Sequence, residues 1–410
     1  MPRMSRVEVF SPDEIAIVHV MNRTVRRCYL MGQDPLTGHN YDHRKGWMET
    51  ELKRLAAYFG IDLLCYAVLS NHFHLVLRSR PDIVESWSDT QVAQRWLMLC
   101  PKRKDKFRRA LEPTPAELNR ILNNRKQLAR IRLRLSDISW WMRLLSQTIA
   151  QRANKEDEEV GKFWQARYKA VRLLDEASLV ACSAYVDLNP IRAAIAESLE
   201  TSAYTSIQQR IEQLKRSAGL GQAPAKGVLS GVVGSQTAPG TDRSNAVARN
   251  SAGGSNSAGA SNSEGADGRA SDAAPSPVAI EWWQAGPGEH LSPLGIDERH
   301  DELGAHPSQG PRASDKGYLP MTTGAYIELL EWTGRQVRAD KRGVIPASLG
   351  PIFERLGISQ EVWLELVKDF GRLFYTVAGK PKKIDETRSK KRKHRYKALA
   401  RTRQLMAGCE

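Results

Sequence analysis

The chain has few cysteines, a deficit of acidic residues and no long uncharged apolar run. Its 410 residues include only five cysteines, which are scattered and form no CxxC pair. An odd, scattered set argues against a disulfide framework and favours a reducing cytoplasm, where we expect the protein to reside. No apolar stretch reaches the length needed to cross a bilayer, so the sequence predicts no membrane partner.

Acidic residues are outnumbered by basic ones along the whole chain. Lysine and arginine total 61 against 46 aspartate and glutamate residues, which gives a formal net charge of +15 and a pI near 9.6. A chain this basic favours a nucleic acid or another polyanion as its partner, although charge alone does not indicate catalysis.

Aromatic residues are missing from the middle of the chain. None stands between Tyr204 and Trp282, where the composition is dominated by Gly, Ala, Ser, Asn and Asp. Such a segment cannot bury enough apolar surface to offset its ordering entropy. The sequence therefore predicts four parts: a folded domain over 1–216, a disordered Gly/Ala/Ser-rich linker over 217–280, a small helical module over 281–380 and a basic tail over 381–410.

Two histidines stand two residues apart in an apolar strand pattern. The run from Cys65 to Leu77 is typical of two strands around a short polar turn, with His72 and His74 on the second strand. Because side chains alternate along a strand, both imidazoles point to the same face. Such a pair can bind a metal ion. The alternative is a strand that carries two histidines by chance, one of them buried and hydrogen-bonded.

A tyrosine and an asparagine share one face of a helix predicted further along the chain. Asp175 is suited to cap the start of this helix, and Pro190 to stop or kink it. Tyr185 and Asn189 are four residues apart, so a phenol nucleophile and an amide oxygen are presented together. The alternative is a buried tyrosine followed by an asparagine that caps the helix end.

Four runs, taken in order, resemble the motifs of the single-tyrosine HUH transposases, and most closely those of the REP-associated tyrosine transposases of bacteria. The runs are VHVMNR at 18–23, NHFHLVL at 71–77, FWQARYK at 163–169 and YVDLNP at 185–190. They span residues of about 15–205, roughly half of the chain.

The resemblance implies metal-dependent cleavage and strand transfer on single-stranded DNA through a covalent 5′-phosphotyrosine intermediate. Tyr185 would be the nucleophile. His72 and His74 would bind the ion, with Asn189 as the third ligand in the place where related transposases use Gln or Glu. This mixed nitrogen and oxygen set suits Mg²⁺ or Mn²⁺, and ligand type alone leaves zinc open.

The order of the predicted elements indicates an α+β fold. Strands are expected near 15–25 and 162–174, the histidine hairpin lies between them, and helices are expected over 47–59 and 140–153. The resemblance implies an RRM-like or ferredoxin-like antiparallel sheet for this domain. Residues 81–137 form an expected insertion with basic helical patterns, which would suit a DNA hairpin, or else a solvated helix face.

One rival nucleophile and three candidate DNA contacts lie in the run at 163–172. Tyr168 competes with Tyr185, which we favour because the resemblance implies a structural or DNA-contacting role for the run that holds Tyr168. Arg167, Lys169 and Arg172 could contact phosphates, or could form an ordinary solvated strand face.

The sequence thus predicts a tyrosine HUH transposase that acts on single-stranded or hairpin DNA, by transposition or by processing of hairpin repeat (REP) elements. A replication or mobilisation nickase shares this chemistry. The alternative from another class is a sequence- or structure-specific DNA-binding regulator without catalysis. The sequence leaves open whether the protein is a homodimer.

Overall fold

The computed structural model describes residues 6–25, 28–106, 109–219, 280–296, 310–337, 346–390 and 400–406. All of these belong to one compact unit, formed by residues 1–221 and 278–410. Most of the predicted linker, residues 220–279, lies outside the described residues. No helix in the described ranges is long and apolar enough to cross a bilayer.

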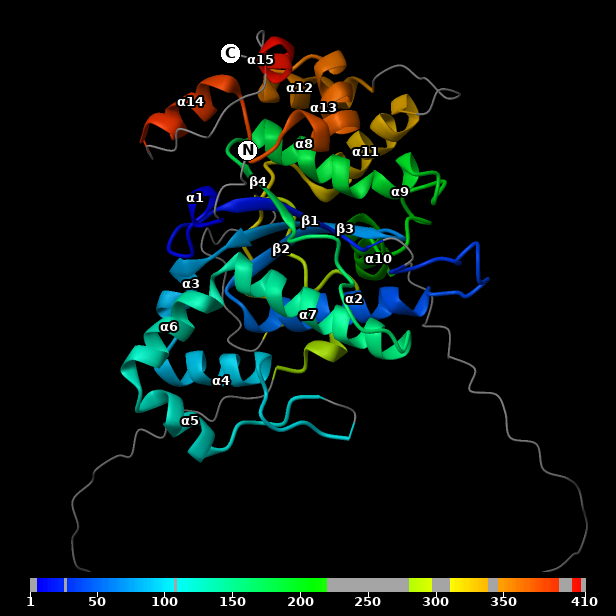
Figure 1. The fold of residues 1–410 in the computed structure, drawn as a ribbon. Helices are drawn as coiled ribbons and strands as arrows, with labels where there is room; N and C mark the ends of the chain where they lie inside the picture. The colour runs from blue at the N-terminus through cyan, green and yellow to red at the C-terminus, as the bar shows by residue number, and fades with distance from the viewer. Residues whose placement is uncertain are drawn as a thin grey trace, which may run out of the picture. The chain divides into compact units, whose positions relative to one another are not determined.

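A five-stranded sheet forms the centre of this unit (Figure 1). The strands are β1 (Ile17–Arg23), β2 (Ile61–Val68), β3 (His72–Ser79), β4 (Lys169–Leu173) and β5 (Val377–Ala378), in the order β2-β3-β1-β4-β5. All neighbours pair antiparallel except β4 and β5, which are parallel. The α+β prediction with a mainly antiparallel sheet is therefore confirmed.

Helices cover both faces of the sheet. On one face, α2 (His43–Tyr58) and α7 (Ile138–Glu156) pack on Phe73, Leu75 and Leu77 of β3. On the other face, α8 (Glu176–Asp187) packs on Val76 of the same strand. This division follows from the alternation of side chains along β3, which also directs His72 and His74 toward α8.

The sequence predicts a basic helical insertion over 81–137, and the described residues of this range, 81–106 and 109–137, form four helices. They are α3 (Pro81–Ser86), α4 (Asp89–Leu99), α5 (Pro115–Leu122) and α6 (Arg125–Leu135). Ser88 and Thr114 each close a capping box, which explains where α4 and α5 begin. On α6, Leu128, Ile131 and Leu135 are buried, so its arginines lie on the remaining faces.

Helices from the C-terminal part of the chain pack against α8 (Figure 1). Three of these helices are α11 (Thr323–Val337), α12 (Gly350–Leu356) and α13 (Gln360–Leu373). The remaining elements are α1 (Arg6–Val9), α9 (Asn189–Arg192), α10 (Ser206–Ser217), α14 (Pro381–Lys390), α15 (Ala400–Leu405) and the 3₁₀ turns η1 (Trp282–Gln284) and η2 (Ala347–Leu349). Ile384 in α14 and Thr402 in α15 are fully buried, so the predicted basic tail also contributes to packing.

The strand expected over 162–174 is shorter in the structure, where β4 covers only Lys169–Leu173. The preceding residues still bond to the end of β1, because the amide of Val25 donates to the carbonyl of Phe163 and that of Gln165 to the carbonyl of Arg23. They form an isolated bridge at Trp164 rather than a regular ladder.

A buried carboxylate, Asp187, joins three separate elements. Its oxygens accept hydrogen bonds from the Ser206 hydroxyl at 2.6 Å, the Ile207 amide at 3.1 Å and the Tyr326 hydroxyl at 2.8 Å. Burial raises the pKa of Asp187 from 3.8 to about 6, although these hydrogen bonds oppose the rise. The folded protein therefore holds this proton more tightly than the unfolded chain.

Asp187→Asn is expected to flatten the pH dependence of stability. Because its folded pKa is raised, Asp187 destabilises the fold as pH rises from about 4 through about 6. The change is on the order of 3 kcal/mol over that window. Thermal melts followed by circular dichroism between pH 4.5 and 7.5 would measure it. Equal pH slopes for the variant and the wild type would contradict this role.

Candidate functional site

The two predicted histidines lie next to each other on the α8 side of the sheet. His74 is buried, with 1 % of its surface exposed, and its ring centroid is 5.1 Å from that of His72. The His72 Nδ1 lies 2.8 Å from the side-chain oxygen of Asn71. The strand pattern thus correctly predicted that the two imidazoles share one face.

Tyr185 faces this histidine pair from α8. Its ring centroid is 5.4 Å from that of His74, and the two rings meet edge to face. Asp175 caps the start of α8, where its Oδ1 accepts from the Ser178 amide at 2.8 Å. The helix ends at Asp187, and Asn189 begins the short helix α9. The Asn189 side chain is close enough to interact with the Tyr185 hydroxyl. Tyr185, Asn189 and the histidines therefore lie in one place.

A third histidine, His19, completes the group. Its Nε2 lies 2.9 Å from the Nδ1 of His74, and the two rings stack at 5.2 Å. One of these nitrogens must donate to the other. The remaining nitrogen of His74, Nε2, is buried and has no hydrogen-bond partner among the described residues. His19 was not predicted as a site residue, although it lies in the VHVMNR run.

All three imidazoles are held in the neutral form near pH 7. Burial lowers the pKa of His19 to about 4, and burial with the nearby charge of Arg23 lowers that of His72 to about 4. Burial lowers the pKa of His74 well below its usual range, helped by the other two histidines and Arg192. Neutral imidazole is the form that binds metal ions.

Some of the side chains at this site are suited to bind a metal ion. The unpartnered Nε2 of His74 is a lone-pair donor if its Nδ1 donates to His19, and the Asn189 amide can supply an oxygen. Across the described ranges, no group of three or more His, Cys, Asp or Glu side chains could hold a metal. The predicted set of His72, His74 and Asn189 contains only two such residues, so its third ligand must be the amide.

Helix α13 forms a wall over Tyr185. The Phe370 ring lies 5.8 Å from that of Tyr185, and a Cβ atom added at Gly371 would lie 3.1 Å from the Tyr185 hydroxyl oxygen. Burial raises the pKa of Tyr185, while interactions with Arg192 and Asn189 oppose the rise. A residue of the C-terminal part of the chain is thus in contact with the candidate nucleophile, which the sequence did not indicate.

Tyr168 lies apart from the histidines. It is buried in the cluster on the α2 and α7 side of the sheet, and its hydroxyl lies 3.2 Å from that of Ser139. The geometry therefore brings Tyr185, and not Tyr168, to His74.

The three cations predicted to contact DNA have different environments. Arg167 and Lys169 are exposed. Arg172 is buried and forms an ion pair with Glu14, so a phosphate would have to compete with that carboxylate. The structure does not gather these three residues into one patch.

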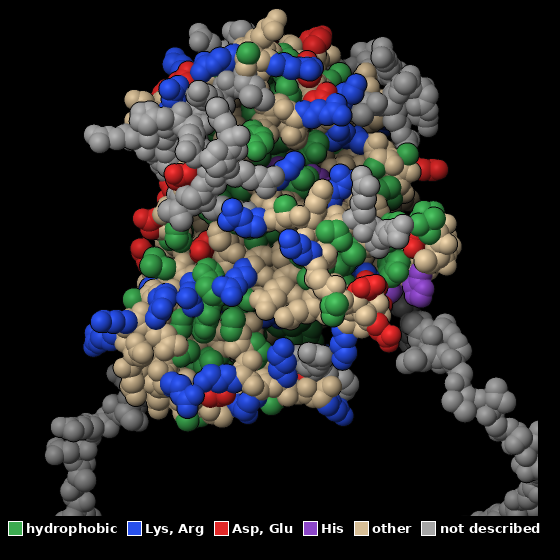
Figure 2. Space-filling view, viewed as in Figure 1, with side chains coloured by type: hydrophobic (Ala, Val, Ile, Leu, Met, Phe, Trp, Pro, Cys, Tyr) green, Lys and Arg blue, Asp and Glu red, His purple; other side chains and the backbone are tan. Residues whose placement is uncertain are grey.

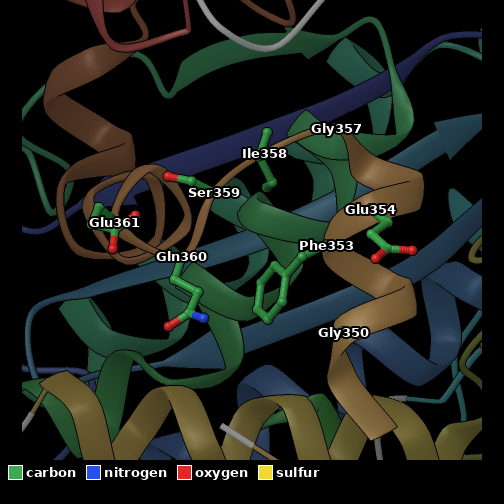
Figure 3. Close-up of a pocket in the computed structure, with 8 residues that line it drawn as sticks. All are labelled: Gly350, Phe353, Glu354, Gly357, Ile358, Ser359, Gln360 and Glu361. Carbon is green, nitrogen blue, oxygen red and sulfur yellow. The ribbon is translucent and has the colours of Figure 1, made fainter. Parts of the chain in front are cut away.

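A pocket elsewhere in the unit does not suit a phosphate. It lies between α12 and the start of α13, with Phe353 at its centre and two acidic side chains, Glu354 and Glu361, on its rim (Figure 3). No lysine, arginine or histidine is among its lining residues. The pocket is not part of the histidine and tyrosine group.

Comparison with known proteins finds one distantly similar solved structure. No protein-family model matches the chain, and no curated protein matches it. One solved structure, of a REP-associated tyrosine transposase bound to a REP hairpin, is similar over 57 % of this chain and 95 % of that chain. The sequence identity is 10 % and the TM-score is 0.30. A likeness this distant does not establish a family, so the conclusions below depend on the site itself.

Proposed function

We propose that the protein cleaves and rejoins single-stranded DNA with Tyr185 as the nucleophile. The observation that supports this most directly is the edge-to-face contact of Tyr185 with His74, whose Nε2 is buried and without a partner among the described residues. A phenol can act as the nucleophile and neutral imidazoles as metal ligands in a metal-assisted attack on a phosphodiester.

The proposed reaction conserves the energy of the broken bond. The Tyr185 oxygen attacks phosphorus, the phenolic proton passes to solvent water, and a bond forms between tyrosine and the 5′-phosphate. The bond from phosphorus to the 3′-oxygen breaks, and that oxygen takes up a proton. Attack on the phosphotyrosine by another 3′-hydroxyl reverses these steps and joins a new strand, so no ATP is needed.

His72, His74 and Asn189 would hold the divalent ion, Mg²⁺ or Mn²⁺ in our proposal. When bound, such an ion withdraws charge from the phosphate and helps to orient it for in-line attack. His19 would position His74 by hydrogen bonding to its Nδ1, which leaves Nε2 for the ion.

We further propose that the sheet belongs to the RRM-like or ferredoxin-like class. The order β2-β3-β1-β4, all antiparallel, with α2 and α7 on one face, supports this proposal. The added parallel strand β5 and helix α8 on the opposite face extend that pattern.

A cationic surface on α6 and α7 is our proposed contact for the DNA hairpin. Lys and Arg side chains gather in Figure 2 over α6 and the start of α7. Partial burial lowers the pKa of Arg134, and the like charges of Arg130 and Arg143 lower it further. Arg134 and Arg143 lie 4.2 and 4.7 Å from the Trp140 ring centroid. Phosphates would relieve this repulsion, and partly exposed indole and guanidinium planes can stack on unpaired bases.

Replacing Arg130 and Arg143 by glutamine is expected to weaken hairpin binding about tenfold at 100 mM salt. The slope of log Kd against log salt should fall by about 1 to 2, because two phosphate contacts would be lost. Fluorescence anisotropy with a labelled hairpin would measure both quantities. The matched control replaces the exposed pair Lys215 and Arg216 of α10. Equal losses in the two double variants would show only a general charge effect.

The test of the proposed function is direct. Purified protein is incubated with labelled hairpin DNA and Mn²⁺, separated by denaturing electrophoresis, and any DNA-linked peptide is mapped. We expect an adduct on Tyr185. Tight binding without an adduct, across a broad set of hairpins, would support the DNA-binding regulator instead.

A further inference from the structure

Arg192 is a half-buried cation beside Tyr185 whose role is not explained by the fold. Its guanidinium carbon lies 4.8 Å from the centroid of the Tyr185 ring. Its Nη2 donates to the carbonyl of Lys368 on α13, which fixes the side chain in place. Its Nη1 is buried and has no hydrogen-bond partner among the described residues. One edge of the guanidinium therefore lacks an acceptor.

The charge of Arg192 is also incompletely compensated. Burial lowers its pKa, whereas Tyr185 and the more distant Asp369 raise it. Among the described residues, no carboxylate lies within ion-pair distance of its guanidinium nitrogens. Leaving the buried Nη1 of this half-buried guanidinium without an acceptor is costly, and a phosphate would supply both the charge and the acceptor oxygens.

Helix α13 is shaped to hold this arginine. Asp369, directly after Lys368, departs from helical geometry, with φ −118° and ψ 21°. The kink lies where α13 meets both Arg192 and Tyr185, and Gly371 leaves room there for the tyrosine hydroxyl. The two contacts of α13 therefore set the position of the cation relative to the nucleophile.

We propose that Arg192 is a catalytic residue that binds a non-bridging oxygen of the scissile phosphate and stabilises the Tyr185 phenolate. This inference rests on the proposed function. As the oxygen of Tyr185 attacks, negative charge moves from the phenol to the phosphoryl oxygens. A fixed guanidinium beside both groups stabilises that charge at each stage and itself stays protonated.

The competing explanation is that Arg192 only ties α9 to α13 through the Lys368 carbonyl. The two explanations differ in what a change of charge does. A structural tie affects folding and the position of α13, whereas a catalytic cation affects the reaction rate and the ionisation of Tyr185.

The experiment compares Arg192→Gln and Arg192→Lys with a matched control, Arg372→Gln. Arg372 also lies on the kinked end of α13, but its side chain is 89 % exposed. Single-turnover adduct formation with the Mn²⁺-loaded protein is measured from pH 6 to 9, with hairpin affinity measured separately. We expect Arg192→Gln to slow attachment about 100-fold with hairpin Kd changed less than threefold. Arg192→Lys should recover part of the rate, and Arg372→Gln should leave it unchanged.

A second measurement does not need DNA. In protein labelled with ¹³C at the tyrosine ζ carbon, the Tyr185 signal is assigned by its absence in Tyr185→Phe and titrated by NMR. Loss of the cation should raise the pKa of Tyr185 in Arg192→Gln and leave it unchanged in Arg372→Gln. If Arg192→Gln does not fold, the test uses Arg192→Lys. A catalytic Arg192 then requires that Arg192→Lys attach DNA faster than Tyr185→Phe does.

The outcomes separate the two proposals. If the wild-type protein forms no adduct, the proposed function fails, and the titration still reports whether Arg192 acts on the phenol. If the wild type forms an adduct but Arg192→Gln matches its rate and its Tyr185 pKa, the catalytic role of Arg192 is overturned and the tie to α13 remains.

Discussion

Tyr185→Phe is expected to abolish covalent attachment of DNA, by at least 1,000-fold, while leaving hairpin binding within about twofold of the wild type. The substitution removes only the hydroxyl oxygen that would attack phosphorus. The ring that packs against His74 and Phe370 remains, so the site should keep its shape. Denaturing electrophoresis with labelled hairpin DNA and Mn²⁺ would measure attachment, and anisotropy would measure binding.

Tyr168→Phe is the matched control for this experiment. It also removes one hydroxyl from a buried tyrosine of the same chain, but on the α2 and α7 side of the sheet. Loss of its contact with Ser139 should cost on the order of 1 kcal/mol of stability and leave attachment unchanged. Attachment that persists in Tyr185→Phe and disappears in Tyr168→Phe would exchange the roles of the two tyrosines.

Local patterns in the sequence were sufficient to predict the parts of the site that depend on one element each. The alternation of a strand places His72 and His74 on one face, and the Asp175 cap with helical spacing places Tyr185 beside Asn189. Both features depend on residues within a few positions of each other. The contact of Tyr185 with His74 agrees with the expectation that these two segments meet.

The parts that depend on distant pairings could not be predicted in this way. His19 reaches His74 only because β1 pairs antiparallel with β3, in a register that sets His19 opposite Val76. Nothing in the local pattern around His19 specifies that register. Arg192 acquires its position from Lys368, which lies 176 residues away in the sequence. A charge pattern along the chain does not reveal which cation comes to lie beside the tyrosine ring.

The environment of Arg172 also depends on segments that are distant in the sequence. The sequence places Arg172 in a run of three cations that could contact phosphate. Strand alternation puts Arg172 on the face opposite Arg167 and Lys169, but it does not show which of the two faces is covered. In the fold, Arg172 is directed toward Glu14, from a segment that precedes β1. Its burial and ion pair follow from the pairing of β1 with β4, which is a tertiary property.

The His74 side chain offers the second large effect, because its two nitrogens have separate roles in our proposal. His74→Asn is expected to reduce Mn²⁺-dependent cleavage at least 100-fold. The asparagine amide nitrogen can occupy the position of Nδ1 and donate to His19 Nε2, so the buried contact is kept. Nothing replaces Nε2, the nitrogen without a partner among the described residues.

His74→Gln is the complementary variant, because its amide reaches toward the Nε2 position and releases the bond to His19. It should retain weak Mn²⁺ binding, measured by electron paramagnetic resonance of the free ion, whereas His74→Asn should lose it. Both variants should bind hairpin DNA as the wild type does, since His74 is buried. Wild-type cleavage and Mn²⁺ affinity in His74→Asn would show that Nε2 is not a ligand. The ion, if one is needed, would then be held by other groups around Tyr185.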